Sequence, residues 1–562
     1  MARSRSRGLL VAALLAATVP AGAVPARGAM PAVSSPEAQD WREDLRFMAA
    51  EMEKRHRNLF HDVSRERFAE AVRSLDQRIP SLPRHRIIVE MARIAAMVGD
   101  GHTSLAPTRD PKVGFRTYPI RLYFFADGLY VRAASREHAD VLGARVLRVG
   151  SASAEEAYRS VREIVGRDNE MGARFFAPHL LVMPEVLDAL GLVDDMESAP
   201  FTLESAGVRR TVRLAPASPA EPMPPDTDAS WAPRPGFVDA RDGAARPLPL
   251  WLAEPDRKYR FVPLPEARAV YVQYNQVANE DGETIAAFAE RLFAFVDANP
   301  VDRLVLDLRR NRGGNGELNR PILLGLIRAR QVDRPGGLFV LIGRSTFSAA
   351  QFLVNDLEKY TDAIFVGEPT GGKVNSYGDS RKIVLPRSGI TVRVSSLWWQ
   401  GDERDRRPWT APQVAADLTF ADYRANVDPA LETSLHWKPG KPLEAQLREA
   451  ADAGDFALAG RRLAAWRTDP VHEYADDVED RLNRLGYALL MEKRPDAAIA
   501  ILRLATDAFP QSANAFDSLG EAQAAAGDRA AAIGSYERAL ALDPRSASAS
   551  DALRKLRAAA QR

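Results

Sequence analysis

The sequence predicts a multidomain α/β protein with an α/β core, a helical module and a β-rich module before it, and helical repeats after it. Between residues 251 and 432, short apolar strand-like segments alternate with amphipathic helix-like segments. This alternation is typical of buried parallel strands joined by helices. The length of 562 residues also exceeds what one hydrophobic core supports. Near the C-terminus, the chain repeats itself with a step of 34 residues, from Leu485 to Leu519.

The beginning of the chain has the three parts of a secretory signal peptide. Basic MARSRSR precedes an apolar run from Gly8 to Val19, and small residues end at Ala23 in a cleavage site of the A-x-A type. The run is shorter than the roughly 20 residues that cross a bilayer. We therefore expect residues 1–23 to be removed on export. The mature chain would be periplasmic or secreted from a bacterium and would have no membrane span.

Composition excludes several classes of function. Lys and Arg number 76 against 75 Asp and Glu, so no excess charge points to nucleic acid as a partner. The chain has no cysteine, which excludes disulfides, thiolate metal sites and a cysteine nucleophile. We expect no metal and no cofactor.

The two modules before the core differ in the spacing of their apolar residues. Residues 36–107 carry apolar side chains at helical spacing, and residues 115–215 form short strands with one helix-like segment. Within the strands, LGARVLRVGSASAEEAYRSV resembles the carboxylate-binding end of a PDZ-like domain. Residues 216–250 are rich in proline and small residues and predict a linker.

The C-terminal repeats occupy residues 440–562. LGYALLMEKRPDAAIAILRLATDAFP aligns in phase with LGEAQAAAGDRAAAIGSYERALALDP, and AGDFALAGRRLAAW around Gly454 looks like a degenerate third helical pair. The period and the small residues resemble tetratricopeptide repeats. Such repeats imply a protein partner or docking on the same chain.

A candidate nucleophile lies in GRSTFSAAQ, between a predicted strand and a predicted helix. The free N–H groups at a helix start can stabilise an oxyanion, which suits Ser348 for nucleophilic chemistry. Serine and threonine are also favoured helix caps, so Ser345, Thr346 and Ser348 could each serve only as a cap.

Glycine-rich loops follow two other strands of the core. VLDLRRNRGGNGE places Gly313 and Gly314 directly after a strand, and VGEPTGGKVNSYGD leads into Lys373. Glycine lets backbone approach a substrate closely, so we expect the amides of Gly313, Gly314 and Ala349 to bind substrate or an oxyanion. Loops at the strand ends of one sheet are where α/β folds build sites.

These segments resemble the tail-specific (C-terminal processing) serine peptidases. DLRRNRGG is similar to their D-L-R-x-N-x-G-G stretch, SAAQ to S-A-S-E, and GEPTGGK to G-E-x-T-F-G-K. Lys373 follows Ser348 by 25 residues, the spacing of that family's Ser–Lys dyad. The resemblance implies a crotonase-like peptidase core and a hydrolase, a serine endopeptidase acting on polypeptides through an acyl-enzyme on Ser348.

The departures from this pattern point to a branch of the family. Gln351 stands where Glu is usual, and Gly371 followed by Gly372 stands where the family has Phe followed by Gly. VGDGHTSL resembles the branch of the tricorn core and the retinoid-binding repeats of the photoreceptor matrix. That resemblance implies His102 as base and an acid from QGDERDRRP, where the sequence leaves three candidates open: Asp402, Glu403 and Asp405.

The base therefore has two candidates. A lysine base must be neutral although an unperturbed lysine has a pKa of about 10.4, whereas histidine begins near 6.5. The unperturbed pKa values favour His102 as the base, whereas the 25-residue spacing from Ser348 favours Lys373. An alternative function is a catalytically inactive peptide- or lipophile-binding protein on the same fold. A serine-directed covalent probe distinguishes the enzyme from the binder.

Overall fold

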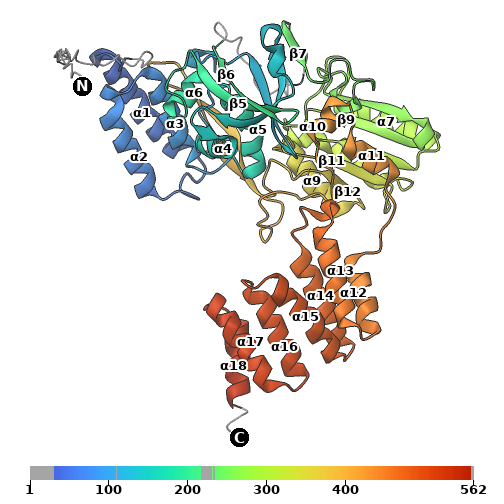
Figure 1. The fold of residues 1–562 in the computed structure, drawn as a ribbon. Coiled ribbons are helices and arrows are strands. Elements are labelled where there is room, and N and C mark those ends of the chain that lie inside the picture. The colour runs from blue at the N-terminus through green and yellow to red at the C-terminus, as the bar shows by residue number, and fades with distance from the viewer. Residues whose placement is uncertain (1–30, 109, 217–230, 232–234, 559–562) are drawn as a thin grey trace, which may run out of the picture.

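The computed structural model describes residues 31–108, 110–216, 231 and 235–558, so the predicted signal peptide lies outside the described residues. Figure 1 shows a body built of helices and two large sheets, from which the C-terminal helices extend as a curved stack. Within the described ranges, no helix is long and apolar enough to cross a membrane.

Three helices open the described chain: α1 (Ser35–Arg55), α2 (Arg65–Arg78) and α3 (Arg84–Ala96). Helix α1 begins at a capping box formed by Ser34 and Glu37, which satisfies free N–H groups of the first turn. The apolar positions that the sequence places at helical spacing lie on its buried face: Trp41, Leu45, Met48 and Met52.

The first sheet has seven strands in the order β1-β2-β3-β5-β6, with β4 beside β3 and β7 beside β2. The strands are β1 (Ile120–Phe125), β2 (Gly128–Ser135), β3 (Arg145–Val149), β4 (Ala152–Ser153), β5 (Ala199–Ser205), β6 (Val208–Leu214) and β7 (Phe237–Asp239). Three helices interrupt them: α4 (Ala154–Arg162), α5 (Glu170–Leu180) and α6 (Pro184–Ala189). Strand β7 lies inside the predicted linker, so that prediction is wrong for residues 237–239, whose backbone pairs with β2.

The second sheet is the predicted α/β core. Its six strands run in the order β15-β12-β11-β10-β9-β8, parallel except for the antiparallel pair β8–β9. They are β8 (Tyr259–Leu264), β9 (Ala269–Tyr274), β10 (Arg303–Asp307), β11 (Leu338–Ile342), β12 (Ile364–Gly367) and β15 (Val414–Ala415).

Helices cover both faces of this sheet because its side chains alternate between two apolar clusters. Helices α7 (Ile285–Ala298), α8 (Arg320–Arg328) and α9 (Ala349–Tyr360) pack with residues such as Leu304 and Leu306 on one face. Helix α11 (Pro429–His436) covers Val305 on the other face, and the short α10 (Phe420–Arg424) precedes it. The mixed α/β fold class is confirmed.

The segments KIVLP and ITVRVSS lie within the chain of the α/β core, but they do not join its sheet. They form a separate antiparallel hairpin of β13 (Ser376–Val384) and β14 (Thr391–Trp399). Its apolar face belongs to the same cluster as the N-terminal helices, and Ser104 pairs with Arg393 across a β-bridge. A strand pattern shows that one face is buried but not which partner buries it.

Over the described residues up to 558, seven helices form the C-terminal array: α12 (Leu443–Asp452), α13 (Phe456–Thr468), α14 (Val478–Met491), α15 (Pro495–Ala508), α16 (Ala513–Ala525), α17 (Arg529–Leu542) and α18 (Ala547–Ala558). The 34-residue step recurs in the packing, because a Cβ added at Gly486 would lie 2.6 Å from Leu502 and one at Gly520 would lie 3.0 Å from Tyr536. Glycine at these crossings allows the paired helices to approach closely.

Candidate active site

Ser348 lies where β11 passes through a short turn into α9. Its backbone has φ 56° and ψ −125°, a conformation that costs a residue with a side chain about 1–3 kcal/mol. Its hydroxyl makes no capping hydrogen bond to the helix. By contrast, Thr346 Oγ1 donates to the carbonyl of Leu308 at 2.9 Å and accepts from Gly343 N, so Thr346 has a local structural role.

His102 meets this hydroxyl from a distant part of the chain. Its Nε2 lies 3.0 Å from Ser348 Oγ, across 246 residues of sequence. The imidazole stacks on the ring of Phe347, with centroids 4.5 Å apart and planes at 25°. Ser380 Oγ of β13 donates to the backbone carbonyl of His102 at 2.9 Å. The hairpin therefore fixes the backbone of His102 opposite the serine.

Asp100 holds the turn that presents His102. One carboxylate oxygen, Oδ1, accepts from His102 N at 2.9 Å, Thr103 N at 2.7 Å and Ser395 Oγ at 2.7 Å, and the other, Oδ2, lies 2.8 Å from His56 Nε2. Burial opposes ionisation of Asp100, but hydrogen bonds from His56, Ser395 and Thr103 outweigh it and hold its pKa below the usual value. The sequence contained this aspartate within VGDGHTSL, but its role went unpredicted.

Asp168 joins the His102 turn to the Lys373 loop. Its Oδ1 accepts from Gly101 N at 2.6 Å and its Oδ2 accepts from Lys373 N at 3.2 Å. Burial, followed by the nearby charge of Asp100, raises the pKa of Asp168 to about 6. The backbone of Lys373 is thus tied through Asp168 to the turn that carries His102. No local pattern in the sequence marked Asp168.

The paired glycines lie directly against the serine. Gly313 has φ 96°, and a Cβ there would lie 2.7 Å from both Ser348 Cβ and Ala349 N. Gly314 packs as closely on Val277, where an added Cβ would lie 2.2 Å from the carbonyl oxygen. Only glycine leaves room for the backbone of this loop to lie so close to Ser348 and Val277. Gly313 N donates to Asn311 Oδ1 at 2.9 Å, which fixes the loop.

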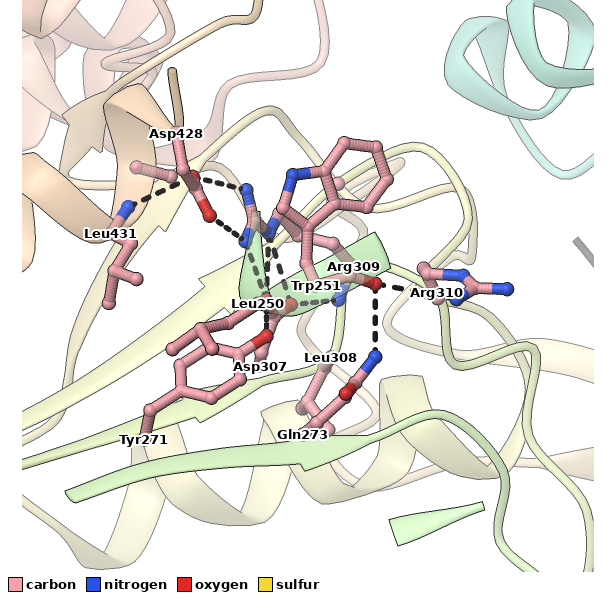
Figure 2. A network of polar contacts seen from close by, with 12 residues as sticks. Leu250, Trp251, Tyr271, Gln273, Asp307, Leu308, Arg309, Arg310, Asp428 and Leu431 are labelled. Atoms are coloured by element: carbon pink, nitrogen blue, oxygen red, sulfur yellow. Dashed lines mark hydrogen bonds and ion pairs between the residues drawn. The ribbon is translucent and has the colours of Figure 1, made fainter. Parts of the chain in front are cut away.

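Asp307 and Arg309 of DLRRNRGG belong to a network of polar contacts (Figure 2). Arg309 binds the carboxylates of both Asp307 and Asp428, and Asp428 in turn accepts from Leu431 N at the start of α11. Tyr271 OH donates to Asp307 at 2.7 Å. This network fixes the end of β10, from which the glycine loop leaves.

The three candidate acids lie in a turn after β14. Asp402 accepts from Arg404 N at 2.9 Å, and Asp405 accepts from the guanidinium of Arg407. Glu403 is exposed. The choice among Asp402, Glu403 and Asp405 as partner of His102 stays a prediction.

The residues that depart from the peptidase pattern, Gln351 and Gly371, both make close contacts around the Lys373 loop. Gln351 is buried and donates to Thr410 Oγ1 at 2.9 Å, and a Cβ added at Gly372 would lie 3.2 Å from Gln351 Cβ. A Cβ at Gly371 would lie 2.2 Å from the carbonyl oxygen of Arg344, so this position also requires glycine. Both changes therefore keep the Lys373 loop close to the serine turn.

Solved structures similar to this chain include peptidases. The structure of mature CPAF complexed with lactacystin is 12% identical, covers 71% of this chain and 98% of that chain, and has a TM-score of 0.49. The photosystem II D1 C-terminal processing protease is 15% identical over 72% of this chain and 97% of that chain, with a TM-score of 0.33. The first tetratricopeptide repeat of Spaghetti (RPAP3), bound to an HSP90 peptide, is 20% identical over 21% of this chain and 94% of its own, with a TM-score of 0.16.

No family model matches the sequence, and no curated protein matches it. The solved structures include peptidases of the type that the sequence motifs resemble. At TM-scores below 0.5, however, the function of this chain has to follow from its own side chains.

A small apolar pocket opens beside the His102 turn. Its wall includes Gly101 and the side chains of Leu105, Ile164, Val165 and Phe176. Gly101 in this wall immediately precedes His102 and packs on Phe347, whose ring would lie 2.7 Å from a Cβ added at Gly101. An apolar side chain fits such a wall better than a charged one.

Proposed function

We propose that this protein is a serine peptidase of the C-terminal processing type with Ser348 as its nucleophile. The observation that carries the proposal is the 3.0 Å contact between Ser348 Oγ and His102 Nε2. The strained backbone of Ser348 supports it, since such strain concentrates at functional sites. A serine hydroxyl is a weak nucleophile until a neighbouring base accepts its proton.

In the first step, Ser348 Oγ forms a bond to the scissile carbonyl carbon while its proton moves to His102 Nε2. The carbonyl π-electrons move to oxygen and give an oxyanion. We assign its hydrogen-bond donors to the amides of Gly314 and Ala349. Ala349 is the first residue of α9, where the N–H has no intrahelical acceptor. Gly313 contributes by keeping this loop against the serine.

In the second step, the imidazolium of His102 gives its proton to the leaving amine as the C–N bond breaks. An ester then links the substrate to Ser348. A water molecule then attacks the ester carbon while His102 accepts its proton; the bond from that carbon to Ser348 Oγ breaks, Ser348 Oγ takes the proton back from His102, and the new carboxylic acid leaves. Lys373 is the alternative base at both steps.

The test of the proposal is covalent labelling by a fluorophosphonate. The intact mass of the full chain should rise by one probe group, and the Ser348→Ala variant should not react. Ser345→Ala is the matched control and should react like the wild type, because its hydroxyl belongs to the same turn but makes no hydrogen bond to His102. An unreactive wild type would favour the alternative of a non-catalytic peptide- or lipophile-binding protein.

The apolar pocket predicts the substrate preference. Cleavage of a random peptide library should enrich apolar residues at one position flanking the cleaved bond and deplete Asp and Glu there. Removing a methylene from such a pocket costs about 10–200-fold in kcat/KM, and a charged side chain should cost at least as much. Mass spectrometry of the products measures this preference. Equal cleavage beside leucine and aspartate would contradict the assignment of the pocket to substrate.

Three finer statements belong to the same proposal. The crotonase-like description of the core and the PDZ-like description of the first sheet rest on the sequence resemblance. Action outside the cytoplasm rests on the signal-peptide pattern of residues 1–23. Fractionation of bacteria that express the full chain tests the last of these.

A further inference from the structure

A chain of polar side chains links the C-terminal repeats to the active-site body. Tyr474 lies between α13 and α14, and its hydroxyl donates to Asp417 Oδ2 at 2.8 Å. Asp417 follows β15, and its carboxyl group lies close enough to that of Glu368, which follows β12, for the two groups to shift each other's pKa. Glu368 binds the guanidinium of Arg344 through both oxygens. Four side chains thus lead from the repeats into the α/β core.

Arg344 stands in the turn that carries the nucleophile. It lies four positions before Ser348 in the sequence, and only 5% of its side chain is exposed. Its guanidinium also donates to the carbonyl of Phe124 in the first sheet at 2.8 Å. In the same turn, the carbonyl of Thr346 accepts from Gly371 N at 3.0 Å and Gly372 N at 3.2 Å. Contacts of this turn therefore fix both the serine and the Lys373 loop.

The charges in the chain do not balance when every carboxyl group is ionised. Arg344 supplies one positive charge against Glu368 and Asp417, and Glu473 lies close enough to add to the negative potential at Asp417. Burial and the charge of Glu368 raise the pKa of Asp417 to about 7. Below that pH, the proton of Asp417 bridges the two carboxyl groups. Above it, two buried carboxylates repel each other beside the serine turn.

We propose that Tyr474, Asp417 and Glu368 are positioning residues, through which the repeat array holds Arg344 and the turn of Ser348 in place. The catalytic reading of this inference rests on the proposed function. Ordering of the turn at residues 343–348 by the repeats does not depend on the chemistry at Ser348. The repeats are then part of the active-site support rather than a separate binding module.

The structural test compares Tyr474→Phe with Tyr487→Phe in the full chain. Both changes remove one hydroxyl, but Tyr487 bonds only within the repeats, to Glu521 and Ser518. Hydrogen–deuterium exchange of the segment 343–348 should become about threefold faster or more in Tyr474→Phe and stay unchanged in Tyr487→Phe, since lost contacts lower the free energy of local opening. Equal exchange of this segment in both variants would overturn the proposal, whether or not Ser348 reacts with a probe.

The pH dependence of acylation gives the catalytic test. In the wild type, the rate should fall as pH rises through about 7, because Asp417 then loses the bridging proton. Tyr474→Phe removes a donor that stabilises ionised Asp417, so this falling limb should move up by about 1–2 pH units, equivalent to one hydrogen bond to a charged group. Asp417→Asn keeps a donor toward Glu368 and cannot ionise, so the limb should disappear. A falling limb of the acylation rate at the same pH in the wild type and both variants would refute the link to catalysis.

Discussion

Replacing His102 by alanine is expected to lower the rate of Ser348 acylation by about two to four orders of magnitude, the usual contribution of a general base. The reason is geometric, because His102 Nε2 lies 3.0 Å from Ser348 Oγ. Acylation by a fluorophosphonate, measured by stopped reactions and intact mass, gives the rate directly. In the wild type, the rising limb of the rate should have an apparent pKa near 6–7 if histidine is the base.

Lys373→Ala is the discriminating variant. If His102 is the base, this change should cost about tenfold or less, because the loop is held through the backbone N–H of Lys373, which alanine keeps. If Lys373 is the base, Lys373→Ala should show the large loss of acylation rate and His102→Ala the small one. The rising limb of the wild-type rate then lies at pH 8 or above. His436→Ala, at the exposed end of α11, is the histidine control and should leave the rate unchanged. Wild-type rates in both His102→Ala and Lys373→Ala would show that another group accepts the proton.

The second large effect concerns the backbone of Ser348. Ser348→Gly and Ser348→Ala should both abolish acylation, because neither has a hydroxyl. They should differ in stability, since φ 56° and ψ −125° strain alanine but not glycine. We expect the free energy of unfolding to be about 1 kcal/mol higher for Ser348→Gly than for Ser348→Ala, which is the strain less the entropy that glycine loses on folding. Urea denaturation of both variants measures the difference.

A helical site supplies the control for that comparison. Ala287 is exposed on α7, where the backbone is helical, so Ala287→Gly should lower the free energy of unfolding by about 1 kcal/mol. Relative to alanine, glycine should therefore raise the free energy of unfolding at position 348 and lower it at position 287. A Ser348→Gly variant that is less stable than Ser348→Ala would show that the turn stores no strain at this residue.

Tyr474 could not be found from the sequence, although the fold class could. Alternating strands and helices predicted the parallel core, and the 34-residue repeat with its in-phase small residues predicted the paired repeat helices. Both patterns are local, because side-chain periodicity and small residues at helix crossings act over a few turns of chain. The bond from Tyr474 to Asp417 joins two loops 57 residues apart, and loops carry no periodic signal.

The sequence by itself determined the strand-end serine, the glycine pair and the loop of Lys373, because each depends on a short segment that must turn, cap or approach closely. Only the tertiary structure decided which residue faces the hydroxyl. It brought His102 to Ser348 through a hairpin that leaves the core sheet and packs with the N-terminal helices. It also placed the carboxylate of Asp168 between the two loops. These contacts depend on which segments, far apart in the sequence, pack together. A strand pattern cannot show this, because it indicates only that one face is buried.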